Sequence, residues 1–219
     1  MEIKVVKQIL EWNEDVSNEI KKTLAEKKVC LINVMGSPGA GKTSLITAVM
    51  TALRDRYRMG VIEGDIAGQI DAEKIDRLGF PVVQLQTDGA CHIEAMSVRH
   101  MLPMFRLEDL DVIFVENIGN LVCPAEFNIG EDFRVAILSV PEGDDKPVKY
   151  PLMFQVCDTV LINKIDALPV FDFSRERVLS GIRERNPRAE VFFVSSRTGE
   201  GYDDWVRHLK EMIERVKEG

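Results

Sequence analysis

Apolar residues at the start of the chain follow a helical spacing. Between residues 2 and 26 they recur roughly every three or four positions, and charged residues fill the positions between them. This spacing predicts one or two amphipathic helices in an N-terminal segment, residues 1–28. The apolar positions are Ile3, Val6, Ile9, Leu10, Val16, Ile20 and Leu24.

From residue 29 onward, short β-rich apolar runs alternate with helical patterns. We expect strands at 29–35, 59–63, 81–85, 111–115, 133–139, 158–163 and 190–194. We expect helices at 42–55, 68–78, 92–101, 172–185 and 202–217, and a long loop between prolines at 141–151. Such alternation is typical of a mostly parallel sheet flanked by helices, so the sequence predicts an α/β fold.

The composition narrows the classes of partner. The 219 residues carry a net charge of −8, which does not favour nonspecific binding to nucleic acid or to an anionic membrane. No apolar run approaches the roughly 18 residues of a membrane span, and the N-terminus lacks a signal-peptide core. We therefore expect a cytoplasmic protein whose four cysteines are thiols or metal ligands rather than disulfides.

A phosphate-binding loop follows the first expected strand. The stretch "GSPGAGKT" fits the pattern GxxxxGK[ST] between a strand and a helix, which is the context that this motif requires. Its N–H groups and the helix N-terminus bind phosphate, Lys42 adds a positive charge, and the Thr43 hydroxyl is a ligand for Mg²⁺. The expected nucleotide-binding residues here are Gly36, Ser37, Pro38, Gly39, Ala40, Gly41, Lys42, Thr43 and Ser44. We therefore predict a P-loop NTPase domain at 29–219.

Two later loops favour guanine as the base. Asn163-Lys164-Ile165-Asp166 ends an apolar run and resembles the NKxD element of GTPases. A carboxylate at Asp166 can accept hydrogen bonds from N1–H and the exocyclic amine of guanine, which adenine does not present together. "VSSRTGEG", at 194–201, resembles the last base-contacting loop of GTPases and would place Ser196 and Arg197 near the base.

Acidic residues at strand ends are candidates for Mg²⁺ binding and for positioning the attacking water. Asp65 and Glu116 end two expected strands, and Asp71 follows the first of them closely. The carboxyl ends of parallel strands border the ligand crevice, so these carboxylates, with Lys42, are the expected catalytic group. We see no glutamine placed to orient water, which predicts slow hydrolysis.

Cysteine and histidine residues suggest a second metal site. Cys91, His92 and Cys123 each follow a strand closely, and thiolate and imidazole ligands suit Ni²⁺ or Zn²⁺. Three ligands leave a tetrahedral site incomplete, so water or a second subunit would complete it. The alternative is that these are three small side chains packed beside the phosphate site.

The remaining cysteines and histidines have simpler interpretations. Cys30 and Cys157 lie in or beside apolar runs and are expected in the core. His100 and His208 lie in helical patterns and are expected to be surface or packing residues.

The chain resembles a known family from about residue 28 to its C-terminus. "ENIGNLVCPAEFNIGED", "PEGDDKPVKYPLMF", "NKID" and "SSRTGEGYDDW" closely resemble the HypB proteins, GTPases that help to insert nickel into [NiFe]-hydrogenase. The resemblance implies GTP hydrolysis with Mg²⁺, a Ni²⁺ or Zn²⁺ site at Cys91, His92 and Cys123, and a homodimer promoted by GTP. It also implies hydrogenase maturation proteins and the hydrogenase large subunit as partners, and a switch role for Asp71.

Three features depart from the family pattern. The first 29 residues contain neither Cys nor His, so we do not expect nickel capture or storage by the N-terminal segment. Asp88-Gly89-Ala90 stands where Gly-Lys-Gly is common, and the loop "IAGQI" at 66–70 lacks the expected threonine.

Two alternative functions remain open at this point. A urease-type accessory GTPase would carry Cys-Pro-His, whereas Cys123-Pro124 is followed by Ala125. The other alternative is a metal-binding chaperone in which nucleotide regulates only assembly.

Overall fold

The structure is a computed structural model that describes residues 2–65, 68, 70–86 and 89–218, with backbone alone for residues 2–10 and 65. The Asp65 side chain, most of the "IAGQI" loop and Asp88 therefore lie outside the described residues. The predictions made for them stay predictions.

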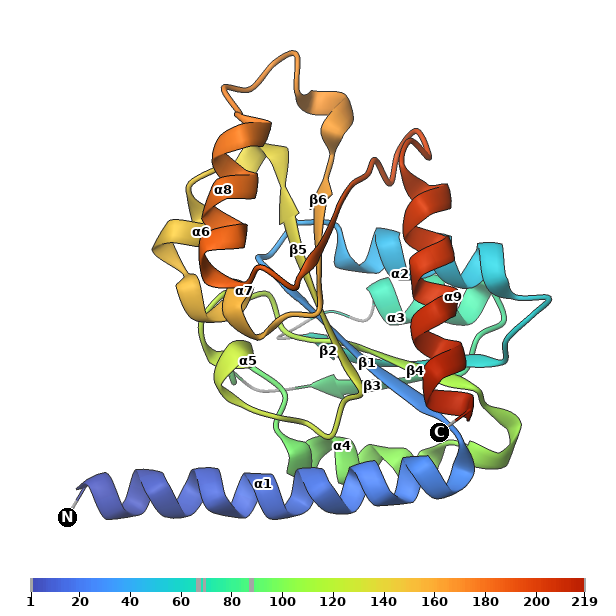
Figure 1. The fold of residues 1–219 in the computed structure, drawn as a ribbon. Helices are drawn as coiled ribbons and strands as arrows, with labels where there is room; N and C mark the ends of the chain where they lie inside the picture. Colours follow the sequence, from blue (N-terminus) through green and yellow to red (C-terminus); the bar gives the residue numbers. More distant parts are fainter. Residues whose placement is uncertain (1, 66–67, 69, 87–88, 219) are drawn as a thin grey trace.

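A parallel sheet forms the centre of the described chain (Figure 1). Its seven strands lie in the order β3-β2-β4-β1-β5-β6-β7, and every neighbouring pair is parallel. The strands are β1 Cys30–Gly36, β2 Met59–Asp65, β3 Val82–Gln86, β4 Val112–Glu116, β5 Phe133–Ser139, β6 Thr159–Asn163 and β7 Glu190–Phe193. The predicted α/β fold is thus confirmed, and all seven strand ranges agree to within two residues.

Helices cover both faces of the sheet. One face packs against α2 Lys42–Leu53, α3 Ile70–Arg77 and α9 Tyr202–Glu218. The other face packs against α1 Glu2–Lys27, α4 Ala95–Met101, α7 Pro151–Val156 and α8 Arg175–Arg185. Alternate residues of β1 supply the two cores, since Ile32 faces the first and Leu31 the second.

The predicted loop at 141–151 is wrong. This stretch contains the 3₁₀ turn Val140–Glu142, the short helix α6 Lys146–Lys149 and the start of α7. Each of its prolines, Pro141, Pro147 and Pro151, lies in the first turn of one of these elements. Proline is tolerated there because its missing N–H would have no helical partner, so these prolines begin helices rather than border a loop.

The N-terminal segment is a single helix. Val16, Ile20 and Leu24 of α1 are buried and share a core with α4. The helix ends where Lys28 adopts a left-handed conformation with φ 56°. The division into a segment 1–28 and a domain 29–219 stays a prediction. None of the described helices is long and apolar enough to cross a membrane.

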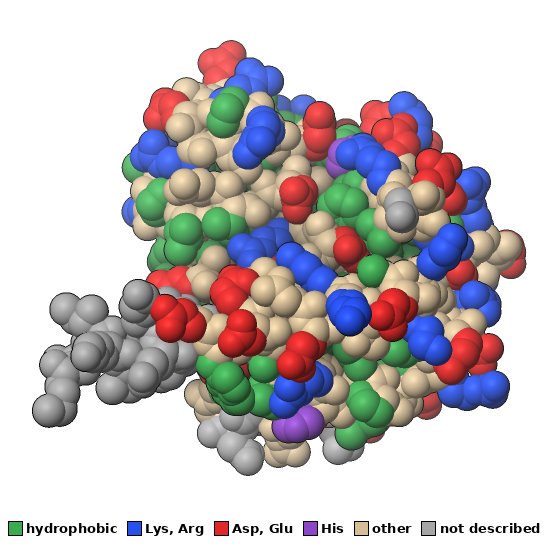
Figure 2. All heavy atoms as spheres, turned by 60° about the horizontal axis from the view of Figure 1, so that its bottom comes forward, with side chains coloured by type: hydrophobic (Ala, Val, Ile, Leu, Met, Phe, Trp, Pro, Cys, Tyr) green, Lys and Arg blue, Asp and Glu red, His purple; other side chains and the backbone are tan. Residues whose placement is uncertain are grey.

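The face formed by α1 and α4 carries charges of both signs side by side (Figure 2). Arg99 of α4 pairs with Glu19 of α1 at 2.9 Å, and Lys27 pairs with Glu108 at 3.6 Å. These exposed pairs contribute little to stability individually.

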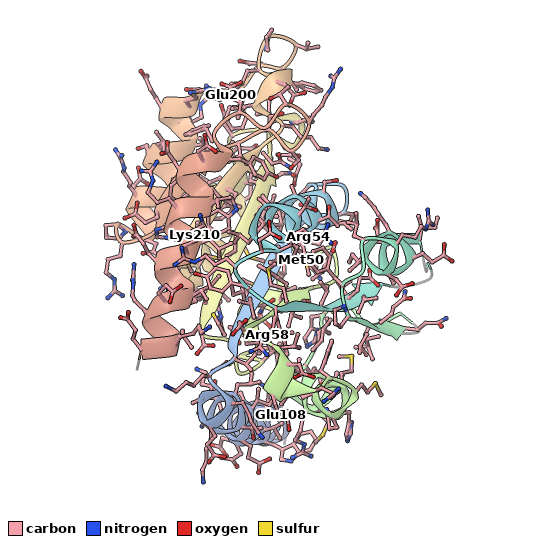
Figure 3. All side chains as sticks on the ribbon, turned by 90° about the vertical axis from the view of Figure 1, so that its right-hand side faces the viewer. Met50, Arg54, Arg58, Glu108, Glu200 and Lys210 are labelled. Atoms are coloured by element: carbon pink, nitrogen blue, oxygen red, sulfur yellow. The ribbon has the colours of Figure 1, made fainter. Side chains whose placement is uncertain are left out.

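Asp111, just before β4, ties three elements together. Its carboxylate accepts hydrogen bonds from the Arg58 backbone and guanidinium and from Lys217 of α9. Burial alone would raise the pKa of Asp111, but these donors outweigh it and hold the pKa well below its usual range. Arg58 also donates to the Glu108 carbonyl at 3.1 Å (Figure 3, where both residues are labelled).

Asp111→Asn is expected to lower the free energy of unfolding at pH 7 by about 1–3 kcal/mol, because an amide cannot accept all of these bonds. A lowered pKa stabilises the fold above the carboxyl's ordinary pKa and loses this effect as the pH falls. The difference between wild type and variant in urea unfolding should therefore shrink below about pH 4. Asp109→Asn is the control, because its pair with Arg106 is exposed; an equal loss in both variants would contradict the role of Asp111.

Candidate nucleotide and metal site

A pocket of about 470 Å³ lies at the carboxyl ends of the central strands. It is lined by the phosphate loop, the ends of β2 and β4, residues 116–119, Asp71 and Lys164. Parallel α/β sheets bind ligands at this edge, where the loops after neighbouring strands converge. The pocket therefore brings together residues that the sequence places in five separate segments.

The phosphate loop joins β1 to α2 and is closely packed. Gly41 has φ 102°, and a Cβ there would collide with the Asn163 amide, so both conformation and space require glycine. The Lys42 ammonium donates to the carbonyls of Gly36 and Ser37, both at 3.3 Å. Burial lowers the pKa of Lys42, and the nearby Glu116 carboxylate partly offsets this. The lysine thus lies over the loop, at the position from which it can reach a phosphate.

The NKxD loop braces the phosphate loop. Asn163 donates to the Ala40 carbonyl at 2.9 Å and accepts from the backbone and hydroxyl of Ser196, both at 3.1 Å. Lys164 adopts a left-handed conformation with φ 60°, and its ammonium donates to the Gly39 carbonyl at 2.6 Å. The two loops that the sequence assigned to base and phosphate are therefore in direct contact.

Asp166 is oriented by a residue that the sequence analysis did not select. The hydroxyl of buried Ser195 donates to the Asp166 carboxylate at 2.6 Å, and Arg197 lies 3.7 Å from its other oxygen. The Ser195 hydrogen bond is the main reason that the pKa of Asp166 lies below its ordinary value. Asp166 is therefore an ionised acceptor, as recognition of guanine N–H groups requires.

Glu116 and Thr43 form the candidate Mg²⁺ site. The Thr43 hydroxyl donates to Glu116 Oε1 at 2.8 Å, while the buried Glu116 Oε2 has no hydrogen-bond partner among the described residues. Burial raises the pKa of Glu116 to about 7, although Thr43 and Lys42 act against the shift. Asp71 lines the same pocket, so three oxygen-bearing side chains fit a hard divalent cation.

Glu63 also belongs to this pocket, although the sequence analysis did not select it. It lies opposite Glu116 in the register of β2 and β4 and is buried. The acidic sequence "VIEGD" contained it, but strand alternation alone did not show that this carboxylate faces the pocket.

Cys91, His92 and Cys123 converge from two segments. One ligand atom from each lies within 4.8 Å of the others, and Cys91 Sγ lies 3.5 Å from His92 Nδ1. The His92 ring stacks on Phe127 at a centroid distance of 4.2 Å, and burial lowers its pKa. A neutral imidazole beside two thiols suits a borderline-soft ion such as Ni²⁺ or Zn²⁺.

The cluster is open to solvent on its thiol side, because Cys91 is exposed and Cys123 is half-buried. His92 Nε2 is buried and lies 3.6 Å from the Glu94 carboxylate. Cys30 and Cys157 are buried in the cores, as predicted. His208 packs on Phe192 and its ring lies 3.2 Å from the Thr159 hydroxyl, so it is a packing residue.

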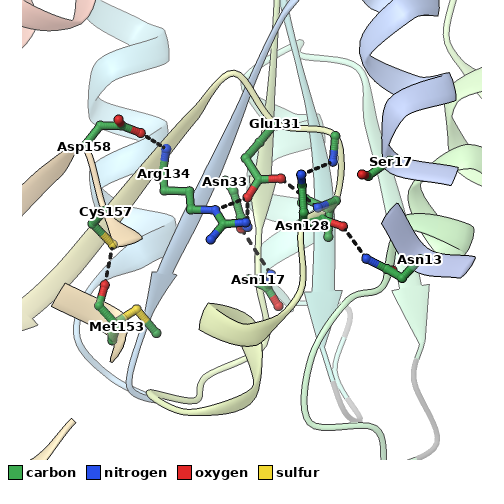
Figure 4. A network of polar contacts seen from close by, with 12 residues as sticks. Asn13, Ser17, Asn33, Asn117, Asn128, Glu131, Arg134, Met153, Cys157 and Asp158 are labelled. Carbon is green, nitrogen blue, oxygen red and sulfur yellow. Dashed lines mark hydrogen bonds and ion pairs between the residues drawn. The ribbon is translucent and has the colours of Figure 1, made fainter. Parts of the chain in front are cut away.

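Residues 116–123 run from the nucleotide pocket to the metal cluster. A Cβ on Gly119 would lie 2.7 Å from the Pro38 nitrogen, so glycine permits the close approach to the phosphate loop. Buried Asn117 donates to Asn33 at 3.1 Å and accepts from the backbone N–H of Ile93, also at 3.1 Å. Figure 4 shows this network, which continues through Asn33 to Glu131 and Arg134.

Comparison with known proteins identifies the family. Residues 30–193 match the family model described as the CobW/HypB/UreG nucleotide-binding domain. The chain is 40% identical over 202 residues to hydrogenase maturation factor HypB of Escherichia coli strain K12, covering 92% of this chain and 70% of that protein. The chain belongs to the HypB family. The probable hydrogenase maturation factor HypB of Methanocaldococcus jannaschii is similar over nearly its full length, at 35% identity and 96% coverage of that protein.

A solved HypB structure agrees with the fold. The crystal structure of HypB from Helicobacter pylori in complex with nickel has a TM-score of 0.88 to this structure at 34% identity. It covers 93% of this chain and 95% of that chain. Membership in the HypB family thus confirms the predicted P-loop fold and the nucleotide-binding class of the domain.

Proposed function

We propose that this protein is a GTP-hydrolysing nickel-delivery factor for the maturation of [NiFe]-hydrogenase. The observation that carries the proposal is the segment 116–123. It begins at Glu116, which contacts Thr43 of the phosphate loop, and ends at Cys123 in the thiol–imidazole cluster. One short stretch of chain therefore adjoins both candidate sites.

The nucleotide pocket would take GTP as substrate. The backbone N–H groups of the phosphate loop and Lys42 would hold the phosphates, and Asp166 would accept from the guanine edge. Thr43, Asp71 and Glu116 are the described residues that would hold Mg²⁺, and Asp65 remains a further candidate. Mg²⁺ bound there would neutralise charge on the phosphate oxygens. Among the described residues that line the pocket there is no glutamine to orient water, which supports slow turnover.

Nickel would be the cargo of the second site. Cys91, His92 and Cys123 supply three ligands, so a fourth position is available for water or for a second copy of the chain. The exposed side chain of Val122, beside Cys123, gives the rim of this site an apolar surface that a second copy would cover. Both features support a homodimer, which GTP would promote through the segment 116–123 that links the two sites.

Delivery would follow from a nucleotide-driven switch. GTP would order the loops around its γ-phosphate and favour the dimer with a well-formed nickel site. Hydrolysis would remove those contacts, loosen both, and release nickel toward hydrogenase maturation proteins and the hydrogenase large subunit. Similarity to hydrogenase maturation factors supports this choice of recipients.

The proposal is tested by titrating nickel into the Mg²⁺-loaded protein with GDP or with a non-hydrolysable GTP analogue, while light scattering reports the mass. We expect the analogue to give a dimer and about tenfold tighter nickel binding. Equal affinity and equal mass in both states would refute the delivery mechanism. Phosphate release from GTP, with Asp71→Ala as control, separates the enzyme from a chaperone in which nucleotide regulates only assembly.

A further inference from the structure

We propose that Asn120 is the positioning residue that transmits the state of the nucleotide to the metal cluster. The inference rests on the proposed function, because it names the group that couples those two sites. Asn120 is half-buried in the segment 116–123 and makes contacts in both directions. Its backbone contacts the phosphate loop, and its side-chain amide contacts the main chain of Cys91 and of Val122, the residue before Cys123.

The first contact joins Asn120 to the phosphate loop. The Asn120 N–H donates to the Gly36 carbonyl at 3.1 Å, in an isolated antiparallel bridge between these two residues. The same carbonyl accepts from the Lys42 ammonium at 3.3 Å. Phosphate oxygens are stronger partners for a lysine than a peptide carbonyl, so a bound triphosphate would draw Lys42 away from Gly36. The Gly36 carbonyl, which accepts from both Asn120 and Lys42, would therefore lose one of its two donors when a triphosphate binds.

The other contacts join Asn120 to the main chain at Cys91 and just before Cys123. Its side-chain N–H donates to the Cys91 carbonyl at 3.3 Å, and its side-chain oxygen accepts from the Val122 N–H at 2.9 Å. The second bond closes a turn that leads directly into the short helix α5 Cys123–Glu126. The Asn120 amide thus holds the main chain at Cys91 and the turn that precedes Cys123. Displacing this amide would change the distance between the two thiols.

The surroundings leave little room to absorb such a displacement. Gly119 contacts Pro38 with no space for a Cβ, and Asn117 is anchored on β1 through Asn33 (Figure 4). Closely packed segments move between discrete arrangements rather than deforming smoothly. Asn117 is fully buried and supports the fold, whereas Asn120 lies at the surface of the segment, which makes it the residue that can be substituted with the fold retained.

The test compares nickel affinities in two nucleotide states for Asn120→Ala and Asn120→Asp. Aspartate keeps the acceptor for Val122 but loses the donor to Cys91. Asn186→Ala is the matched control. The Asn186 oxygen accepts from Arg188 two residues on, at 3.1 Å, and its amide donates to the Cys157 carbonyl at 2.8 Å, outside the segment 116–123.

In wild type and Asn186→Ala, we expect nickel to bind about tenfold tighter with the GTP analogue than with GDP. In both Asn120 variants that ratio should fall below about twofold, with nickel stoichiometry and nickel-free GTP affinity retained. A wild-type ratio in Asn120→Ala or Asn120→Asp would overturn the role of Asn120 and leave the proposed function standing. Loss of nickel binding in every nucleotide state would overturn it too, because it would indicate structural support alone. A ratio near one in wild type would instead refute the proposed function itself.

Discussion

Cys123→Ala is expected to weaken nickel binding at least about 100-fold, which exceeds the loss usual for residues that merely support a metal ligand. The thiol is one of three ligands that converge within 4.8 Å, and an alanine methyl group cannot coordinate a metal. The remaining cysteine and histidine would leave two coordination positions to water. Competition with a chromophoric nickel chelator measures the affinity directly.

Cys157→Ala controls for the general effect of losing a thiol. Cys157 is buried in the core, and its sulfur donates to the Met153 carbonyl at 2.9 Å. Burial raises the pKa of this thiol far above its ordinary value, so it stays protonated. We expect wild-type nickel affinity in this variant. Unchanged stoichiometry and affinity in Cys123→Ala would show that the metal site is assigned to the wrong residues.

Asp166→Asn is expected to reduce GTP affinity about 100-fold or more and to favour xanthosine triphosphate over GTP. The carboxylate can accept from two guanine N–H groups, whereas an amide presents one acceptor and one donor. Xanthine carries an oxygen where guanine carries the exocyclic amine, so it matches the amide better. Displacement of a fluorescent nucleotide by GTP, ATP and xanthosine triphosphate gives the three affinities.

The control for Asp166→Asn is Asp172→Asn, which removes an exposed carboxylate from the same loop region. This variant should keep the wild-type order of nucleotide affinities, because the base would be recognised by Asp166. A preference for GTP that survives in Asp166→Asn would contradict the assignment of this loop to guanine.

The parallel sheet and its functional edge were predictable because the strand patterns are strong. A buried parallel strand is a continuous apolar run, and its carboxyl end marks the ligand-binding edge. That rule alone was enough to expect Cys91 and Cys123 at one rim, although 32 positions separate them. The same rule brought Glu116 to the pocket.

The polar residues that orient the site were not predictable from the sequence. Ser195 and Asn120 are ordinary loop residues by composition, and their roles come from contacts with segments distant in the chain. The short helices after Ser139 were missed because prolines are typical of loops as well as of the first turns of helices. The start of α4 at Ala95 rather than 92 leaves His92 in the preceding turn, where its ring can stack on Phe127.

The hydrogen bonds from Asn163 and Lys164 to the carbonyls of Ala40 and Gly39 join the NKxD loop directly to the phosphate loop. A nucleoside or an inorganic phosphate alone would contact only one of these two loops. A full nucleotide would contact both loops at once and would stabilise the contact between them. Under the proposed function, the loop that would select the purine is bonded directly to the loop that would hold the phosphates, so a wrong base would weaken both contacts before hydrolysis.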